Sequence, residues 1–171
     1  NLAIFIILIM KIIKILSINN QNKIKVFFGG SRSGNIGGTL NKIKKLKLFY
    51  GESIFNFNII YLMSNTPYLN RLNIFLVKKL KIPIIHNQNG LFYPSWYKGN
   101  FYKRNLEIYK QYTNADFIFF QSNFCKNISY KFLDKPKCNN IVLYNAVDTN
   151  FYQPLKKQFK QNKNFSFLIT G

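Results

Sequence analysis

The sequence predicts an α/β domain of Rossmann-like type, a mostly parallel sheet with helices on both faces. Short apolar runs of strand length alternate along the chain with longer segments whose apolar residues recur at helical spacing. A glycine-rich turn follows the first apolar run, at residues 29–38. The runs are apolar at nearly every position, whereas a strand with one solvent-exposed face alternates apolar and polar residues. Continuous apolar runs are typical of parallel strands that are covered on both faces. The alternation therefore predicts about six strands joined by right-handed connections.

Six apolar runs are expected to form strands. They cover residues 23–28, 57–62, 81–87, 116–121, 141–144 and 165–171. The run 116–121 is rich in Phe and Ile, and we expect both of its faces to be buried. Pro83 stands near the start of its run, where a strand tolerates proline.

Four helices are expected between these strands, each with an apolar stripe. The first follows the glycine turn, the second is capped by Ser64 or Asn65, the third begins near Asn100 and the fourth is capped by Ser122. The inward residues are expected to be Ile43, Leu46 and Phe49 or Tyr50; Leu69, Leu72, Phe75, Leu76 and Leu80; Phe101, Leu106, Ile108 and Tyr112; and Phe124, Ile128 and Phe132 or Leu133.

The length of 171 residues and the apolar fraction of 47% indicate one folded globular domain. We expect four parts: an apolar and basic extension at 1–22, the α/β domain at 23–154, a linker at 155–164, and the first strand of a truncated second domain at 165–171. The chain begins with Asn1, so we expect a fragment or a start upstream of the true one. Leu2 to Met10 is apolar but too short to span a bilayer. It is either an interfacial anchor or untranslated sequence before an initiating Met10.

The charge is strongly positive, with 25 Lys and Arg against 5 Asp and Glu and a formal net charge of +20. Such a charge favours phosphate-bearing ligands, nucleic acid or an anionic membrane surface. Lys, Asn, Ile, Phe and Tyr are enriched together, however, as the codon bias of an AT-rich genome would produce. The lysines are spread along the chain, so the charge by itself does not choose a partner.

The residues that bind metals or act as acids and bases are few. Two cysteines, Cys125 and Cys138, and one histidine, His86, cannot build a Cys/His zinc site, and they suit a reduced, cytoplasmic protein. His86 falls inside an expected strand, which favours a core role over catalysis. No metal, cofactor or general base is therefore expected, and the catalytic residues stay unassigned.

The glycine turn admits several interpretations. Gly29 and Gly34 have the spacing of a Walker loop, but Asn35 and Ile36 stand where its Lys and Ser or Thr are required. Gly30, Gly34 and Gly37 are closer to a dinucleotide fingerprint. That fingerprint needs an acid, or an Arg for a 2′-phosphate, after the second strand, and residues 59–65 supply neither. A tight turn with no ligand also remains open.

A longer pattern lies between Ala115 and Pro154. A buried run is followed by a capped helix, a second run, and a polar turn at the carboxyl end of that run. The matching residues are Ala115, Asp116, Ser122, Phe124, Ile141, Asn145, Val147, Asp148, Phe151 and Pro154, with Ala146 where glycine is usual. This series of matching residues resembles the end of the first domain in glycosyltransferase family four, enzymes with the two-domain GT-B architecture.

The resemblance implies a retaining glycosyltransferase that uses a nucleotide-sugar as co-substrate and a glycan or lipid-linked acceptor. This chain would be the acceptor-side domain, inactive alone because the donor-binding domain is missing. It would be cytoplasmic or bound peripherally to the inner face of an anionic membrane, with no nucleic-acid partner. The paired glycines Gly37 and Gly38 would border the cleft, and Asn89 stands where the family commonly has histidine, so it can position a substrate but not titrate.

The expected substrate-binding residues are therefore Gly37, Gly38, Asn89, Gly90, Trp96 and Asn145. Trp96, Tyr97 and Lys103 lie in an aromatic and basic segment that suits a sugar acceptor but also single-stranded nucleic acid. Two other classes stay open: an NAD-dependent oxidoreductase or sugar-nucleotide epimerase, and a basic nucleic-acid-binding module.

Overall fold

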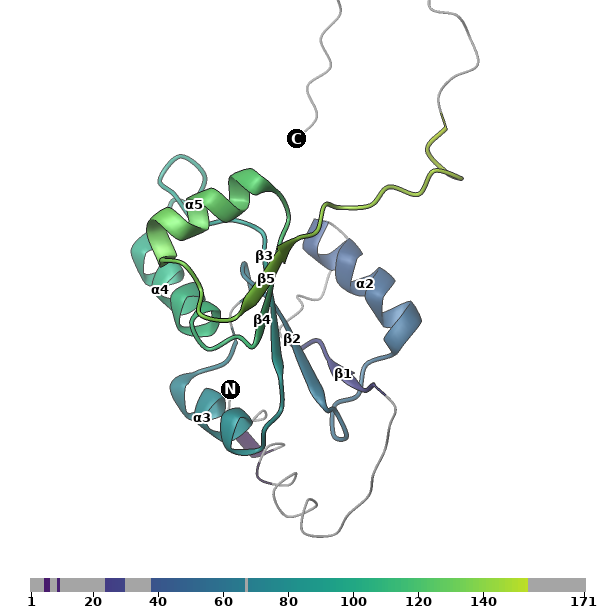
Figure 1. Cartoon of the computed structure of the whole chain (residues 1–171), viewed down its shortest axis with the longest axis vertical. Coiled ribbons are helices and arrows are strands. Elements are labelled where there is room, and N and C mark those ends of the chain that lie inside the picture. Colours follow the sequence, from purple (N-terminus) through teal and green to yellow (C-terminus); the bar gives the residue numbers. More distant parts are fainter. Residues whose placement is uncertain (1–4, 7–8, 10–23, 30–37, 67, 154–171) are drawn as a thin grey trace, which may run out of the picture.

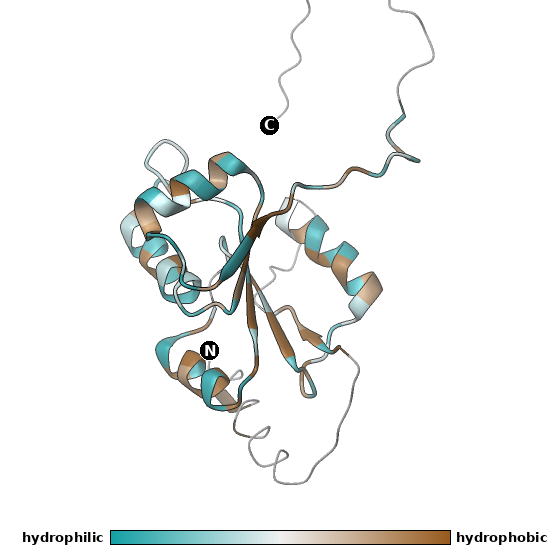
Figure 2. Cartoon of the chain, viewed as in Figure 1, coloured by the Kyte–Doolittle hydropathy of each residue, from teal (hydrophilic) through white to brown (hydrophobic). Residues whose placement is uncertain are grey.

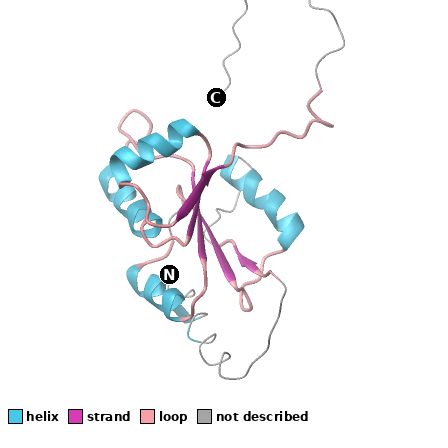
Figure 3. Cartoon of the chain, in the orientation of Figure 1, coloured by secondary structure: helices cyan, strands magenta, loops and turns pink. Residues whose placement is uncertain are grey.

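A computed structural model of the chain describes residues 5–6, 9, 24–29, 38–66 and 68–153. It contains a five-stranded sheet in which every neighbouring pair is parallel, in the order β1-β2-β3-β4-β5 (Figures 1 and 3). The strands are β1 (Val26–Phe27), β2 (Ile59–Met63), β3 (Ile84–Gln88), β4 (Phe117–Phe120) and β5 (Asn139–Val142). The α/β class predicted from the sequence is thus confirmed, and all strand carboxyl ends meet at one edge.

Four helices connect the strands: α2 (Gly38–Tyr50), α3 (Arg71–Lys79), α4 (Phe101–Tyr112) and α5 (Asn123–Leu133). Three begin at a capping side chain. Ser122 is the predicted cap of α5, and Asn100, near which a helix was expected to begin, caps α4; each accepts a hydrogen bond from the backbone N–H three residues on. For α3 the cap is Asn70, so the prediction of Ser64 or Asn65 was wrong. Ser64 and Asn65 lie instead directly after β2, at the carboxyl edge of the sheet.

The two faces of the sheet carry separate cores, which confirms helices on both faces. On one face Ile60, Leu62, Ile84, Ile118 and Phe120 pack with buried residues of α3, α4 and α5. On the other, Val26, Phe28 and Met63 pack with Ile43 of α2. Figure 2 shows the strands as predominantly hydrophobic ribbons between these layers. Alternate residues of the strands are therefore buried on opposite sides of the sheet. Helix α2 packs alone on one face, and α3, α4 and α5 pack on the other.

The expectation of right-handed connections throughout was wrong. The strands follow one another in order across the sheet, yet α2 covers one face and α3, α4 and α5 cover the other. The β1–α2–β2 connection therefore has the opposite hand to the other three. Because α2 lies over the β1–β2 side, the same face of β4 is less covered, and Phe117 and Phe119 are only half-buried. The expectation that β4 is buried on both faces was also wrong.

The predicted helix stripes were partly wrong. Ile43, Leu69, Ile108, Tyr112 and Leu133 are buried as expected. Leu72, Phe75, Leu106, Phe49, Tyr50 and Phe124 are exposed instead. In α5 the buried residues that face the sheet are Cys125, Ser129 and Leu133. The side chains of Cys125 and Ser129 are small and allow the helix to pack closely. Apolar residues occur on both sides of these helices, so periodicity alone did not identify the inner face.

Asp116, one of the residues that match the family pattern, clamps the amino-terminal edge of the sheet. One carboxylate oxygen accepts from the backbone N–H of Ile84 at 2.7 Å, and the other pairs with Nζ of Lys78 at 2.6 Å. The residue therefore joins β3, the start of β4 and α3. These contacts explain why an aspartate stands at this position of the family pattern without any ligand.

Several predicted parts fall outside the described residues: the linker at 155–164, the strand at 165–171, and the extension at 1–22 except residues 5, 6 and 9. Among the helices that are described, none combines the length and hydrophobicity needed to cross a bilayer. Cys125 and Cys138 are both free thiols.

Candidate functional site

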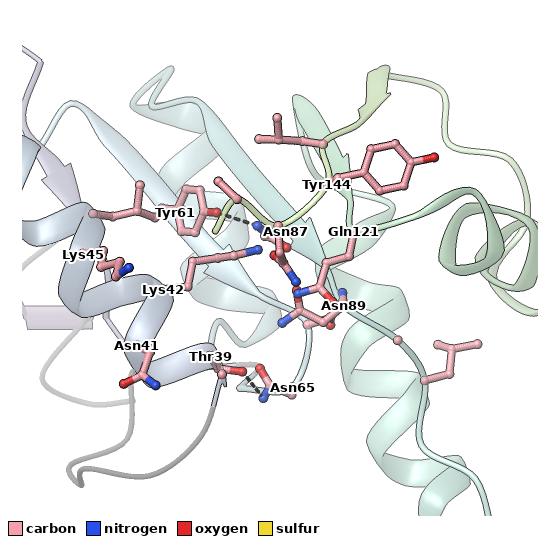
Figure 4. Close-up of a pocket in the computed structure, with 18 of the residues that line it drawn as sticks. Thr39, Asn41, Lys42, Lys45, Tyr61, Asn65, Asn87, Asn89, Gln121 and Tyr144 are labelled. Atoms are coloured by element: carbon pink, nitrogen blue, oxygen red, sulfur yellow. Dashed lines mark hydrogen bonds between the residues drawn. The ribbon is translucent and has the colours of Figure 1, made fainter. Parts of the chain in front are cut away.

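A pocket of about 790 Å³ opens at the carboxyl edge of the sheet, on the face that carries α2. This is the volume range of small-molecule sites, and it is the edge where open parallel sheets bind their ligands. Its walls come from the start of α2, the ends of β2, β3 and β4, the loop after β3 and the segment after β5 (Figure 4). The topology thus assembles one site from five separate stretches of the chain.

Five of the six predicted substrate-binding residues line this pocket: Gly38, Asn89, Gly90, Trp96 and Asn145. Gly37 lies outside the described residues. Of the neighbouring candidates, Tyr97 packs against Phe92 on the edge of the core, and Lys103 is exposed on α4 away from the pocket lining. The pocket therefore collects residues that the sequence spreads over more than a hundred positions.

Gly38 and Gly90 leave room at the pocket. A Cβ built at either position meets nothing within 4 Å, and neither residue has a positive φ. Glycine is therefore not required at either position by backbone strain. Its effect is to keep space open and the backbone within reach of a ligand.

The floor of the pocket is a polar network between β2 and β3. Nδ2 of Asn87 donates to the hydroxyl of Tyr61 at 2.6 Å, and the backbone N–H of Asn89 donates to Oγ of Ser64 at 3.0 Å. Burial raises the pKa of Tyr61, so its hydroxyl is neutral near pH 7. The Tyr61 oxygen accepts from Asn87 and keeps its own proton available for a further acceptor.

Three amide oxygens in the pocket wall lack a donor. They are the Oδ1 atoms of Asn65, Asn87 and Asn89, each shielded from solvent and without a hydrogen bond. Nδ2 of Asn65 is already engaged, since it donates to Oγ1 of Thr39 at 2.7 Å. An unsatisfied buried acceptor costs about 1–3 kcal/mol. The wall therefore favours a ligand that brings hydroxyl donors.

The pocket is also positively charged. Lys42 and Lys45, from the first turns of α2, line it, and no acidic residue does so among the residues described. Lys42 is half-buried, and its ammonium group forms no ion pair or hydrogen bond within the described part of the chain. Burial lowers the pKa of its ammonium group. Figure 4 shows the Lys42 side chain reaching from α2 toward Asn87.

An aromatic loop forms the mouth of the pocket. Trp96 is 59% exposed, with its ring 5.0 Å from that of Phe92 and 6.3 Å from that of Tyr93. The loop is anchored because the side-chain amide of Asn105 accepts from the N–H of Phe92 at 2.9 Å and donates to its carbonyl at 2.8 Å. Trp96 is thus an exposed ring on a fixed support, suited to stacking on a flat ligand face.

His86 belongs to the core and not to this pocket. It is fully buried on the opposite face of the sheet, Nε2 contacts Oε1 of Gln88 at 2.8 Å, and its ring meets the edge of Tyr112. Burial lowers its pKa to about 4. The prediction of a core role for His86 is confirmed.

The chemistry that the pocket lining can perform is binding and orientation. Its polar groups are amides, hydroxyls and two ammonium groups, none of which is a general base of ordinary pKa near 7. No cluster of His, Cys, Asp or Glu suited to a metal ion occurs in the described ranges.

Several lining residues were not singled out by the sequence: Thr39, Lys42, Lys45, Tyr61, Ser64, Asn65, Asn87 and Gln121. A usable signal existed, since most polar members directly follow or end an apolar run. Ser64 and Asn65 were instead interpreted as helix caps, and Lys42 and Lys45 as part of a diffuse charge. Which face of α2 pointed inward could not be predicted without its partners in the sheet.

Comparisons of the chain with models of protein families, with curated proteins and with solved structures find no match. The fold and the pocket define its class: an α/β domain of Rossmann-like type with a ligand-sized cleft at the carboxyl edge of its sheet.

Proposed function

We propose that this chain is the acceptor-side domain of a retaining glycosyltransferase, an enzyme that moves a sugar from a nucleotide-sugar to a glycan or lipid-linked acceptor. The observation that carries the proposal is the pocket itself. Residues chosen from the family resemblance, among them Asn89, Gly90 and Asn145, line one cleft together with the exposed ring of Trp96.

The lining suits a sugar. Carbohydrates present hydroxyl groups, which amides can bind as donors and acceptors, and a ring face that stacks on an aromatic side chain. In this proposal Asn87 and Asn89 orient the acceptor hydroxyls and Trp96 covers one face of the ring. Asn89 cannot take a proton, so the groups that complete the transfer belong to the donor and to the domain that binds it.

The two alternatives have less support. A dinucleotide site needs an acid or an Arg after β2, and Ser64 and Asn65 stand there. Most of its glycine fingerprint, residues 30–37, lies outside the described part of the chain. A nucleic-acid module would use the net charge of +20, but a pocket of about 790 Å³ has the size of a small-molecule site.

Peripheral contact with a membrane gains support from the far end of α2. Leu48 and Phe49 are 84% and 82% exposed, and the exposed Lys44 and Lys45 precede them on the same helix. Apolar residues next to lysines suit the surface of an anionic membrane. We therefore propose peripheral contact with such a surface through α2.

The test uses the intrinsic fluorescence of Trp96, the only tryptophan in the chain and a member of the pocket lining. Titration of the 171-residue protein with mono- and disaccharides should give a saturable change in emission. Asn89→Ala should weaken binding about fivefold, the loss of one hydrogen bond. Gly90→Leu should weaken it more strongly, because the added side chain enters the open space beside Gly90.

Asn127→Ala is the matched control, because Asn127 is exposed on α5 away from the pocket. It should bind saccharides as the unchanged protein does. The proposal fails if no saccharide alters the emission of Trp96 while NAD or a single-stranded oligonucleotide does so in a way that Gly90→Leu abolishes.

A further inference from the structure

We infer that the outer surface of α3 and α4 is a docking site for an acidic amphipathic helix of a partner protein. A groove of about 420 Å³ lies between these two helices, on the side of the sheet opposite α2 (Figure 1). Its walls include Arg71 and Phe75 from α3, and Tyr109 and Lys110 from the end of α4. The groove is separate from the pocket beside α2, and the inference does not depend on the proposed function.

The first observation is that apolar side chains are exposed along this groove. Phe75 on α3 is 56% exposed and Tyr109 on α4 is 38% exposed, and the core residue Ile74 also lines the groove. Leu106 and Tyr102 precede Tyr109 by one and two helical turns, so they continue its side of α4, and both are exposed. Apolar side chains that gather in this way mark an interaction surface, whereas single ones do not.

The second observation is an unbalanced positive charge beside these apolar side chains. Lys78 pairs with Asp116 at 2.6 Å and Lys110 with Glu107 at 2.8 Å, so two of the cations in the lining have partners. The guanidinium of Arg71 forms no ion pair or hydrogen bond within the described part of the chain. Arg71 is also the first residue of α3, whose first turn has no acidic residue, and the helix dipole disfavours a cation there. A carboxylate supplied by a partner would offset both effects.

Charge and shape together select the occupant. A second copy of the chain carries the same net charge of +20 and has only 5 acidic residues, so like charges oppose its approach. A bilayer presents a flat surface, whereas this groove is concave and bounded by two helices. Such a groove fits a third helix, whose side chains enter it as ridges. In this arrangement the apolar side chains of the partner contact Phe75 and Tyr109, and its carboxylates face Arg71.

The experiment measures binding of a synthetic peptide to the 171-residue protein by fluorescence anisotropy of a label on the peptide. The peptide is an amphipathic helix of about 15 residues, with Leu and Ala on one face and Glu on the other. One comparison peptide has the same composition in scrambled order, and another has Lys in place of every Glu. The acidic amphipathic peptide should bind saturably and about tenfold more tightly than the scrambled one, which cannot bury an apolar face. The Lys peptide should not bind.

Variants locate the bound peptide. Phe75→Ser removes an exposed ring and should weaken binding about tenfold, because the peptide loses apolar contact area. Arg71→Gln should weaken binding about threefold and reduce its dependence on salt concentration. Phe124→Ser is the matched control, since Phe124 is an exposed phenylalanine of α5 outside the lining, and it should bind as the unchanged protein does. Tm measurements show whether each variant is folded, and Tyr109→Ser repeats the test if Phe75→Ser is not.

Four results would overturn the inference. Equal binding of the amphipathic and scrambled acidic peptides would reduce the surface to a general attraction between charges. Binding that Phe75→Ser and Tyr109→Ser leave unchanged would place the peptide elsewhere. Partition onto anionic vesicles that Phe75→Ser weakens, without peptide binding, would assign the surface to a membrane. A dimer of the protein alone that Phe75→Ser dissociates would assign it to a second copy. None of these results bears on saccharide binding beside α2, so the proposed function is tested separately.

Discussion

Acidification should destabilise this fold by protonating the buried side chain of His86. Its pKa is about 4 in the folded protein against 6.5 for an unperturbed histidine, because the imidazole is fully buried. The unfolded chain therefore binds this proton more tightly than the folded protein does. The stability that depends on neutral His86 is complete above pH 6.5 and is lost as the pH falls toward 4.

Proton linkage sets the size of the effect. With these two pKa values, the penalty is about 0.2 kcal/mol at pH 7, about 1.4 kcal/mol at pH 5.5 and about 2.5 kcal/mol at pH 4.5. Carboxylates also titrate in this range. A matched variant, His86→Gln, cancels them because it retains every carboxylate and lacks only the titrating ring.

The assay is urea denaturation followed by far-UV circular dichroism at pH 7.0, 5.5 and 4.5. The free energy of unfolding of the unchanged protein should fall by about 2 kcal/mol more than that of His86→Gln between the extremes. The variant is expected to be the less stable protein at pH 7, since it replaces a packed ring. Parallel pH profiles for the two proteins would show that His86 is not buried and neutral as described, and would refute the reasoning.

Three other changes test particular contacts. Ser122→Ala should destabilise the protein by about 1 kcal/mol, because the cap of α5 is lost, as measured by urea denaturation. Asp116→Ala should cost about 1–2 kcal/mol in the same assay, mostly from the hydrogen bond to Ile84, since the ion pair with Lys78 is largely solvated; an unchanged midpoint would contradict the clamp. Leu48→Ser should weaken partition onto anionic vesicles about tenfold in a sedimentation assay, and equal partition would contradict contact through α2.

The strands were predicted well because their signal is strong and local. A run such as Ile59 to Met63 is apolar at nearly every position, and its burial confirms this pattern. The inner faces of the helices were predicted poorly, since apolar residues lie on both sides. Polar Asn73 is fully buried in α3 while its apolar neighbour Leu72 is half exposed. Only contacts with the sheet decide which side packs inward.

Some residues of the candidate site could likewise be predicted from the sequence, and others could not. Asn89, Gly90 and Asn145 were predicted from the family resemblance, and each also closely follows an apolar run, at the edge where parallel strands place ligands. Lys42 could not be predicted, since nothing local separates it from the other lysines of a chain with a net charge of +20. Its significance depends on which carboxylates are absent from its surroundings, a property of the folded arrangement and not of the sequence around it.

Helix α2 stands alone on its face of the sheet among the described elements, and its one fully buried anchor is Ile43. It also carries Lys42, while Asn87 sits on the sheet across the cavity. A molecule that contacts both Lys42 and Asn87 would connect α2 to the sheet and restrict the motion of the helix. Occupancy should then slow hydrogen exchange in the amides of α2 while leaving α3 unchanged, so the least supported helix of the domain would report whether the cavity is filled.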